Sequence, residues 1–300
     1  MRYGLRFETT IARPVSISGV GLHHGVPVNL RILPAPAATG IVFERTDLDF
    51  FRIPACYSHV ARVSYATSLM RQGVLISTTE HLLSVLYSTG IDNAIIQIDN
   101  LEVPIVDGSG APFVQLIREA GIRKLRRKRR YLCVKQEITV EAPGKRITIL
   151  PADRFLLTCA IFFDHPLVGH QQLRVDVTPE RYAAEIAPAR TFGFAWELDQ
   201  MRNMGLIRGA SLENAICFER EQVMNPGGLR FADEPCRHKV LDLIGDLALI
   251  GKPLVGHVVA ERAGHAMHTA LVARIMSDPN LYEILTFDEL ASRVVDALVS

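Results

Sequence analysis

Apolar and polar positions between Asp233 and Gly251 predict a helix that has two different faces. Apolar residues recur at helical spacing on one face, at Leu241, Ile244, Leu247 and Ala248. Polar residues follow in steps of four on the other face, at His238, Asp242 and Asp246. Asp233, with Pro235 in the first turn, predicts the start of this helix, and Gly251 followed by Pro253 predicts its end.

The polar face of this helix suggests a metal site. An imidazole and a carboxylate one turn apart can both reach a single metal ion. An isolated His-x-x-x-Asp pair is more often a solvated surface pair. Here the pair lies in an otherwise apolar helix, where Lys239 and two carboxylates need partners if they are buried. The metal hypothesis requires a third ligand and a base from elsewhere in the chain.

A second predicted helix runs from Ser77 to Tyr87 and carries Glu80 beside His81 in its first turn. Ser77 and Glu80 have the spacing of a capping box, in which Glu80 bonds to the backbone of Ser77. The alternative is that His81 supplies the third metal ligand and Glu80 acts as a general base. Taken alone, these residues favour the capping interpretation.

The order of the other elements predicts two related halves. Short antiparallel strands are expected within residues 1–50, a buried strand at 91–99 and a helix at 112–120. Further strands are expected at 131–141, 146–150 and 155–163. The helix at 233–250 is then followed by an apolar strand at 255–260 and a helix from about Gly264. This repeated order indicates duplication of one strand-rich unit with two helices.

Between these halves, the stretch from Ala187 to Phe231 reads as an inserted strand-helix-strand segment. Its apolar side consists of Leu198, Leu206, Ile207, Ala215 and Ile216. Such a stripe is ordinarily part of a core. If it is open on one side, it can instead hold a hydrocarbon chain.

Several histidines lie outside the two polar helices. His23 and His24 occupy a glycine-rich turn, where the backbone can approach a ligand closely. His265 stands at a helix N-terminus and needs a carboxylate partner if it is to be cationic, for which Asp246 is a candidate. His257 and His268 are assigned structural roles.

Composition and charge narrow the class of protein. A chain of 300 residues with 48% apolar residues can build two domains with their own cores. The net charge of +1 hides a basic run at 123–130, which holds seven of the 33 basic residues. A solvated linker between domains is the favoured interpretation of this run, and binding to nucleic acid or anionic lipid is the alternative. We expect the run to mark the domain boundary.

Cysteine spacing and hydropathy point to a cytoplasmic protein. The five cysteines are scattered without a C-x-x-C spacing, which disfavours disulfides and a thiolate zinc site. The first ten residues contain no apolar signal segment, and no stretch approaches the ~20 apolar residues that a membrane helix requires.

Seven motifs, taken in order, resemble the family of UDP-3-O-acyl-N-acetylglucosamine deacetylases, zinc amidases of lipid A biosynthesis. They are GVGLHHG, TTEHLLSVLYSTGIDN, PIVDGSGAPF, FFDHP, ARTFGF, LRFADEPCRHKVLDLIGDLALIG and AGHAMH. The resemblance covers nearly the whole chain. It implies an α+β fold of two similar domains, each with two helices packed on β-sheets and one insert, and an active site between them. We place the domains at 1–126 and 127–300, with the second insert at about 192–217.

The resemblance also implies roles for the polar residues of both helices. The zinc ligands would be His81, His238 and Asp242, with one position left for water, although this donor set would also accept iron(II). Glu80 would be the general base, and His265, oriented by Asp246, the general acid. Thr191 would polarise the acetyl carbonyl together with zinc, and Lys239 would contact the substrate.

Matching positions further imply a binding site for the acylated nucleotide sugar. His23, Lys145 and Phe163 match positions near the nucleotide sugar, where Lys145 suits the diphosphate and Phe163 suits stacking on uracil. The insert would form an apolar passage for the acyl chain, with Phe192, Phe194, Leu198 and Ile207 as lining residues. His268 departs from the family, which often has Asn there, and receives no role.

The expected partner is the substrate, without nucleic acid and without an obligate protein partner. Weak association of residues 123–130 with an anionic membrane surface is a further hypothesis.

Two competing interpretations stay open. One is a binding protein built on the basic run with a structural metal site, which four protein ligands would favour, whereas only three are found. The other is a zinc amidase that acts on a different N-acyl sugar.

Overall fold

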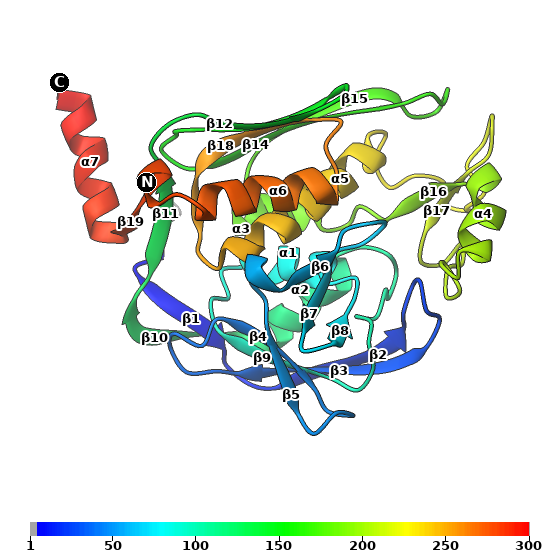
Figure 1. Cartoon of the computed structure of the whole chain (residues 1–300), viewed down its shortest axis with the longest axis horizontal. Coiled ribbons are helices and arrows are strands. Elements are labelled where there is room, and N and C mark those ends of the chain that lie inside the picture. The colour runs from blue at the N-terminus through cyan, green and yellow to red at the C-terminus, as the bar shows by residue number, and fades with distance from the viewer. Residues whose placement is uncertain (1–4, 300) are drawn as a thin grey trace.

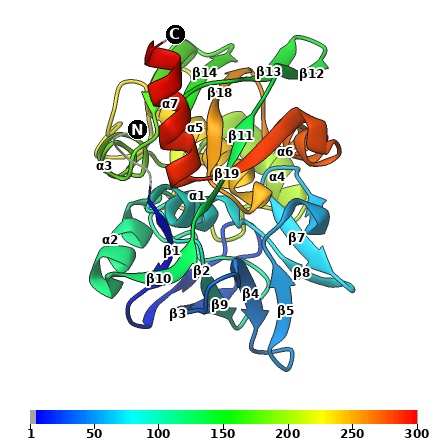
Figure 2. The ribbon, with the colours of Figure 1, turned by 90° about the vertical axis from the view of Figure 1, so that its left-hand side faces the viewer.

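The computed structural model describes residues 5–299, and side-chain exposure is defined for residues 5–293. Two large β-sheets form the outer layers, and the main helices lie between them (Figure 1). The same layering appears when the molecule is turned by 90° (Figure 2). The fold is therefore the expected α+β arrangement. No helix in the described residues is long and apolar enough to cross a membrane.

The first half of the chain forms a five-stranded sheet in the order β2-β3-β9-β4-β5. Its strands are β2 Val15–Val20, β3 Pro27–Pro34, β9 Ala94–Ile98, β4 Ile41–Arg45 and β5 Phe51–Pro54. The antiparallel β2–β3 and β4–β5 pairs confirm the prediction for the start of the chain, and the later strand β9 joins the sheet antiparallel to β3 and parallel to β4. A separate three-stranded sheet consists of β6 Val60–Arg62, β7 Ser68–Arg71 and β8 Val74–Ile76.

The second half forms a seven-stranded sheet that branches at β18. The strand order is β12-β13-β18-β11-β19, and β14 pairs with both β18 and β15. The strands are β11 Arg130–Val134, β12 Ile138–Ala142, β13 Lys145–Leu150, β14 Phe155–Phe163, β15 Gly169–Asp176, β18 Leu254–Glu261 and β19 Tyr282–Thr286. The strands expected at 131–141, 146–150, 155–163 and 255–260 are present, the first of them divided between β11 and β12.

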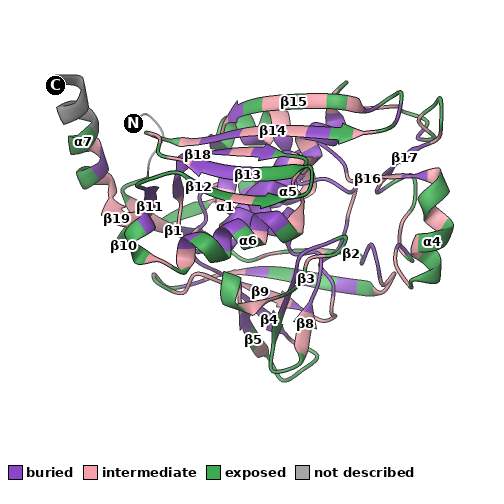
Figure 3. Cartoon of the chain, turned by 45° about the horizontal axis from the view of Figure 1, so that its top comes forward, coloured by how far each residue is buried: buried purple, intermediate pink, exposed green. Residues whose placement is uncertain are grey.

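Four helices fill the space between the two sheets: α1 Glu80–Ser88, α2 Ala111–Ala120, α5 Glu234–Leu247 and α6 His265–Met276. Their order along the chain confirms the predicted helix-strand-helix repeat. Buried residues concentrate on α1, α5 and the strands facing them (Figure 3). At the crossing of α1 and α5, a Cβ on Gly245 would lie 2.1 Å from the Glu80 carbonyl oxygen. Glycine at 245 thus allows the two polar helix segments to meet.

The predicted ends of α5 are partly confirmed. A 3-10 turn, Ala248–Ile250, follows the helix, and Gly251 ends it in the left-handed conformation with φ of 73°. The Asp233 side chain, however, makes no capping hydrogen bond. Its carboxylate instead accepts a 2.6 Å hydrogen bond from Arg237 one turn later, so Asp233 occupies the predicted N-cap position without capping the helix through its side chain.

The insert projects from one end of the molecule and has the predicted strand-helix-strand order (Figure 1). It contains β16 Phe192–Phe194, α4 Leu198–Asn203 and β17 Ile216–Phe218, with β16 and β17 paired in parallel. The chain also includes α3 Pro179–Arg181, a π-helical turn at Tyr182–Ile186 and the C-terminal helix α7 Phe287–Val299. Short 3-10 turns occur at Tyr57–His59, Ala195–Glu197 and Pro279–Leu281.

The basic run is a β-strand, which corrects its interpretation as a solvated linker. Strand β10, Ile122–Lys128, pairs antiparallel with β1, Phe7–Ile11, and the chain passes directly from β10 into β11. Six of the seven side chains of β10 are exposed. Arg129, between the two strands, is buried and donates a 2.8 Å hydrogen bond to Asp92. The run therefore connects the two sheets through strand pairing and a buried ion pair.

Candidate metal centre and active-site pocket

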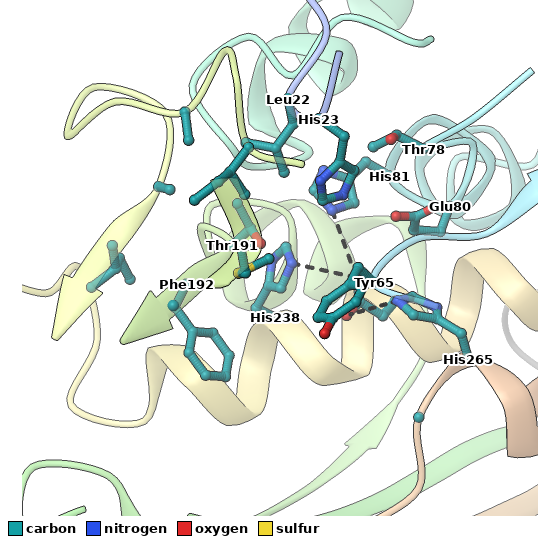
Figure 4. Close-up of a pocket in the computed structure, with 18 of the residues that line it drawn as sticks. Leu22, His23, Tyr65, Thr78, Glu80, His81, Thr191, Phe192, His238 and His265 are labelled. Atoms are coloured by element: carbon teal, nitrogen blue, oxygen red, sulfur yellow. Dashed lines mark ion pairs between the residues drawn. The ribbon is translucent and has the colours of Figure 1, made fainter. Parts of the chain in front are cut away.

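The first turn of α1 and the middle of α5 bring His81, His238 and Asp242 together, as Figure 4 shows for the two imidazoles. One donor atom from each residue lies within 4.8 Å of the other two. The Asp242 Oδ1 atom is 3.6 Å from His81 Nε2 and 3.3 Å from His238 Nε2. Tetrahedral ligands at zinc bond lengths lie ~3.3 Å apart. The cluster therefore fits a metal ion with little rearrangement.

The charge state of this cluster also suits a metal ion. Burial, helped by the neighbouring His238, lowers the pKa of His81 to about 3. Burial raises the pKa of Asp242, but Lys239 and the surrounding imidazoles outweigh it and hold this pKa well below its usual range. The Nδ1–H of His238 donates to the Ala189 carbonyl at 3.1 Å, which leaves the Nε2 lone pair free. Neutral imidazoles and an ionised carboxylate are the forms that bind metals.

Glu80 stands next to His81, but it does not form the predicted capping box. The helix begins at Glu80, and the Glu80 carboxylate accepts a 3.0 Å hydrogen bond from the backbone N–H of Thr67. Burial raises the pKa of Glu80 to about 8, with His265 opposing the shift and Asp242 adding to it. The capping interpretation of Glu80 is therefore wrong, and its carboxylate lines the pocket.

At the start of α6, His265 makes the predicted contact with Asp246. The His265 Nδ1–H donates to Asp246 Oδ2 at 2.8 Å, and the Thr67 hydroxyl donates to Oδ1 at 2.5 Å. Burial lowers the pKa of His265, but the Asp246 carboxylate outweighs it and raises this pKa to about 9. His265 is thus a cation at neutral pH, and its Nε2 lies 3.9 Å from Asp242 Oδ2.

His268, expected to be only structural, makes a specific contact with the same carboxylate. Its Nδ1 lies 2.8 Å from Asp246 Oδ2, and the side chain is buried. Its position three residues after His265 on a helix was the available sequence signal, because side chains at that spacing share a face. Asp246 therefore receives hydrogen bonds from both imidazoles and from Thr67.

Thr191 and Lys239 both lie near the cluster, Thr191 just before β16 and Lys239 on α5. Lys239 Nζ donates a 2.8 Å hydrogen bond to Asp242 Oδ2, so it has the partner that its burial requires. Thr191 precedes β16, and its backbone N–H bonds to the Gly108 carbonyl at 2.8 Å. A buried ion pair between Arg190 and Glu234, 2.9 Å apart, anchors the same segment. The Thr191 and Lys239 side chains both line the pocket.

One cavity of about 600 Å³ joins the cluster to the insert. Twelve residues expected at the site line it: His23, Glu80, His81, Lys145, Thr191, Phe192, Leu198, Ile207, His238, Lys239, Asp242 and His265. Phe163 and Phe194 pack behind Phe192, with ring centroids of Phe163 5.5 Å from Phe192 and 5.4 Å from Phe194. The insert adds Met201, Leu212, Ile216 and Met224 to the lining. The cavity thus has a polar end at the cluster and an apolar end in the insert.

His23 reaches the polar end of this cavity from the glycine-rich turn (Figure 4). Its side chain is only 4% exposed, yet neither ring nitrogen has a hydrogen-bond partner within the described structure. Burial lowers its pKa, against the opposing effect of Glu102. The adjacent His24 places Nδ1 2.8 Å from Glu102 Oε2. Sequence reasoning missed Glu102 altogether.

A buried cluster of two imidazoles and one carboxylate, with a second carboxylate beside it in a large cavity, is an arrangement that metal-dependent hydrolases use. The chain matches the family described as LpxC, UDP-3-O-acyl N-acetylglycosamine deacetylase, over residues 8–277. The protein belongs to this family. Its members are metalloenzymes that hydrolyse an amide bond.

Curated relatives agree with this assignment along almost their whole length. The chain is 71% identical over 296 residues to UDP-3-O-acyl-N-acetylglucosamine deacetylase of Solibacter usitatus, covering 99% of this chain and 100% of that protein. It is 44% identical over 279 residues to the deacetylase of Myxococcus xanthus, covering 93% and 89% of the two chains. The deacetylase of Anaeromyxobacter sp. Fw109-5 is 45% identical over 278 residues, covering 93% and 91%.

Proposed function

We propose that the protein removes the N-acetyl group from UDP-3-O-(3-hydroxyacyl)-N-acetylglucosamine and releases acetate, as a step of lipid A biosynthesis. The observation that carries this proposal is the single cavity that joins the buried His81, His238 and Asp242 cluster to an apolar insert. An amide hydrolase for an acylated sugar needs both parts. Full-length similarity to curated deacetylases supports the same substrate.

The metal in this proposal is zinc, held by His81, His238 and Asp242. Bound zinc supplies Lewis acidity to a carbonyl oxygen and makes a water molecule easier to deprotonate. The three donors are neutral imidazoles and an ionised carboxylate, which zinc binds well. Iron(II) accepts the same donor set, so metal content in the cell depends on supply.

Glu80 acts as the general base that takes a proton from the attacking water. Its carboxylate is buried, is held by the Thr67 N–H and lies in the cavity beside His81. Its pKa of about 8 applies to the protein without a cation. A cation held by the cluster would lower that pKa, because opposite charge favours the ionised carboxylate. The carboxylate then suits proton transfer near neutral pH.

His265 acts as the general acid that protonates the leaving amine nitrogen. Asp246 holds its Nδ1–H and keeps the ring cationic, so the Nε2–H is free to donate into the cavity. The Thr191 hydroxyl and the Lys239 ammonium line the same region. Thr191 donates to the carbonyl oxygen on which negative charge develops, and Lys239 contacts the substrate beside it.

The rest of the cavity matches the other parts of the substrate. Leu198 and Ile207, with the apolar insert around them, accommodate the acyl chain. His23 and Lys145 face the nucleotide sugar. Phe163, expected beside the nucleotide sugar, and Phe194, expected in the acyl passage, are not among the residues that line the cavity, and both pack against Phe192. Stacking of Phe163 on uracil stays a prediction.

We further propose that the chain divides into domains at 1–126 and 127–300, with the active site between them, and that it acts in the cytoplasm. Strands β2 to β9 build only the first half's sheets, and β11 to β15 with β18 and β19 build only the second half's large sheet. Weak membrane association of residues 123–130 stays a prediction. The five exposed basic side chains of β10 support it.

The proposed function is tested by acetate release from UDP-3-O-acyl-N-acetylglucosamine, compared with UDP-N-acetylglucosamine that lacks the acyl chain. We expect the zinc-loaded protein to cleave the acylated substrate and to discriminate against the other by at least about tenfold, because the apolar insert is otherwise unfilled. Equal rates on both would point to a different N-acyl sugar. No release from either by the folded, zinc-loaded protein would refute the proposal.

A further inference from the structure

Glu102, a fully buried carboxylate outside the metal cluster, holds four hydrogen-bond donors. Its Oε1 accepts from the His23 backbone N–H at 2.9 Å and from the Thr78 hydroxyl at 2.8 Å. Its Oε2 accepts from the His24 backbone N–H at 2.8 Å and contacts His24 Nδ1 at the same distance. The side chain is 0% exposed. Such a set of donors fixes the carboxylate and the backbone around it.

The turn at 21–25 is shaped around this carboxylate. A Cβ on Gly21 would lie 2.3 Å from Glu102 Oε2, so the residue at 21 must lack a side chain for the turn to close. Gly21 has no positive φ, so space alone explains the glycine. The insert packs on the same turn, since the Arg208 N–H donates to the His23 carbonyl at 3.1 Å and the Gly209 N–H to the Leu22 carbonyl at 3.0 Å.

The turn presents one unsatisfied side chain to the cavity. The His23 ring is buried and lines the cavity, and neither ring nitrogen makes a hydrogen bond of full geometry within the described structure, although the Tyr65 backbone lies close enough to raise its pKa. Buried polar atoms in folded proteins nearly always have a hydrogen-bond partner. The two ring nitrogens are thus available to a polar group of a ligand in the cavity, and the backbone position of His23 decides whether the ring reaches it.

Glu102 also ties this turn to the segment that starts α1. Thr78 has a φ of 57°, a left-handed conformation that a β-branched residue rarely adopts. Its hydroxyl donates to Glu102, and the chain then continues through Thr79 to Glu80 and His81. One carboxylate thus connects the turn that carries His23 with the helix that carries the base and a metal ligand.

We propose that Glu102 is a positioning residue that holds the 21–25 turn so that the His23 imidazole bonds to the sugar or diphosphate oxygens of the nucleotide sugar. This inference rests on the proposed function for the identity of the ligand. Glu102 itself does not line the cavity. The inference is that its effect on binding passes through His23, which distinguishes it from a residue that only stabilises the fold.

The test is a double-mutant cycle on ligand affinity, measured by calorimetric titration of UDP-N-acetylglucosamine into zinc-loaded protein. Glu102→Gln places an amide N–H₂ against donors of the turn, and we expect it to weaken binding by about tenfold or more. His23→Ala should weaken binding similarly. In the His23→Ala background, Glu102→Gln should then change affinity by less than about twofold, because residues that act through one contact are not additive.

Glu44→Gln is the matched control. Glu44 is another buried glutamate, bonded to Arg52 and Gln97 at 2.8 Å each, and it does not line the cavity. It should lose stability without losing affinity. Gly21→Ala is the second probe if Glu102→Gln fails to fold. The new Cβ displaces the Glu102 carboxylate without removing it, so Gly21→Ala should also weaken binding about tenfold.

Three results would overturn the inference: additive losses in the double variant, unchanged affinity in Glu102→Gln, or loss of folding in both Glu102→Gln and Gly21→Ala. A wild-type protein that binds no UDP-sugar would overturn it as well. Acetate release is measured in parallel. A wild-type protein that binds the UDP-sugar but releases no acetate from the acylated substrate contradicts the proposed function, and the affinity cycle still decides the role of Glu102.

Discussion

Replacing Asp246 by asparagine tests the electrostatic origin of the His265 cation. The Asp246→Asn change keeps the size of the side chain, and its single amide oxygen can still accept from Thr67 if the amide nitrogen takes the position of Oδ2, beside His265 and His268. The change removes the negative charge that lies 2.8 Å from His265 Nδ1. Without this charge, burial is the dominant influence on His265, and burial favours the neutral imidazole.

The size of the effect follows from the pKa of about 9 against the ordinary 6.5. This difference corresponds to ~3 kcal/mol favouring the charged form in the folded protein. At pH 7 the wild-type ring is almost fully protonated, whereas a ring with a pKa of 6.5 or less is protonated to roughly a quarter or less. We therefore expect the pKa of His265 in the metal-free Asp246→Asn variant to fall to 6.5 or below.

Stability should follow the same change. A histidine with a raised pKa in the folded state adds stability that is fully present below pH 6.5 and is lost as the pH rises through about 9. The metal-free wild type should therefore be more stable than the variant below pH 6.5. As the pH rises through this window, the difference between their free energies of unfolding should shrink by up to ~3 kcal/mol. Urea unfolding at several pH values measures this gap.

The direct assay is an NMR titration of the His265 ring signals in chelator-treated protein. Asp233→Asn is the control, because it makes the same change on the same helix at a carboxylate that pairs with Arg237. The control should leave the His265 titration near 9. A wild-type His265 that titrates near 6.5, or a His265 ring in Asp246→Asn that still titrates near 9, would refute the electrostatic argument.

Three further predictions concern the metal, the acyl passage and the fold. Glu80→Gln should retain one zinc while acetate release falls by roughly 10²–10⁴-fold. His81→Ala should lose the metal. Equal zinc loss in both variants, measured by elemental analysis, would exclude Glu80 as the base. Ala215→Phe, in the cavity lining, should raise KM roughly tenfold for long acyl chains and much less for short ones, and a uniform rise would place the chain elsewhere. Arg129→Met leaves the mostly buried Asp92 without its charged partner, with only the Thr9 N–H still bonded to it, and should lower the free energy of unfolding by about 3 kcal/mol. Unchanged urea midpoints would contradict this prediction.

Local patterns of the sequence predict the helices of this fold well, because their apolar faces are continuous along the chain. The polar stripe His238, Asp242 and Asp246 has helical spacing, and the structure places all three on α5. The place of His265 at a helix N-terminus indicates a need for a carboxylate partner, and Asp246 is that partner in the structure. The ligand roles themselves came from the family resemblance and stay predictions.

Contacts between distant segments could not be predicted in this way. Glu80 has the spacing of a capping box, but it bonds to Thr67, which reaches it through the three-stranded sheet. The basic run is a strand only because β1 pairs with it from more than a hundred residues away. Glu102 lacks any local signal, because its donors come from the turn at 21–25 and from Thr78. Each of these depends on tertiary structure that local propensity does not encode.

The central claim is that one metal ion in the His81, His238 and Asp242 cluster supports removal of the N-acetyl group. The most direct measurement strips the protein with a chelator and titrates zinc while following acetate release from UDP-3-O-acyl-N-acetylglucosamine. We predict that activity disappears on stripping and returns with a break near one equivalent of zinc, and that His238→Ala shows no such return. Full activity in the stripped protein, or full recovery in His238→Ala, would contradict the claim.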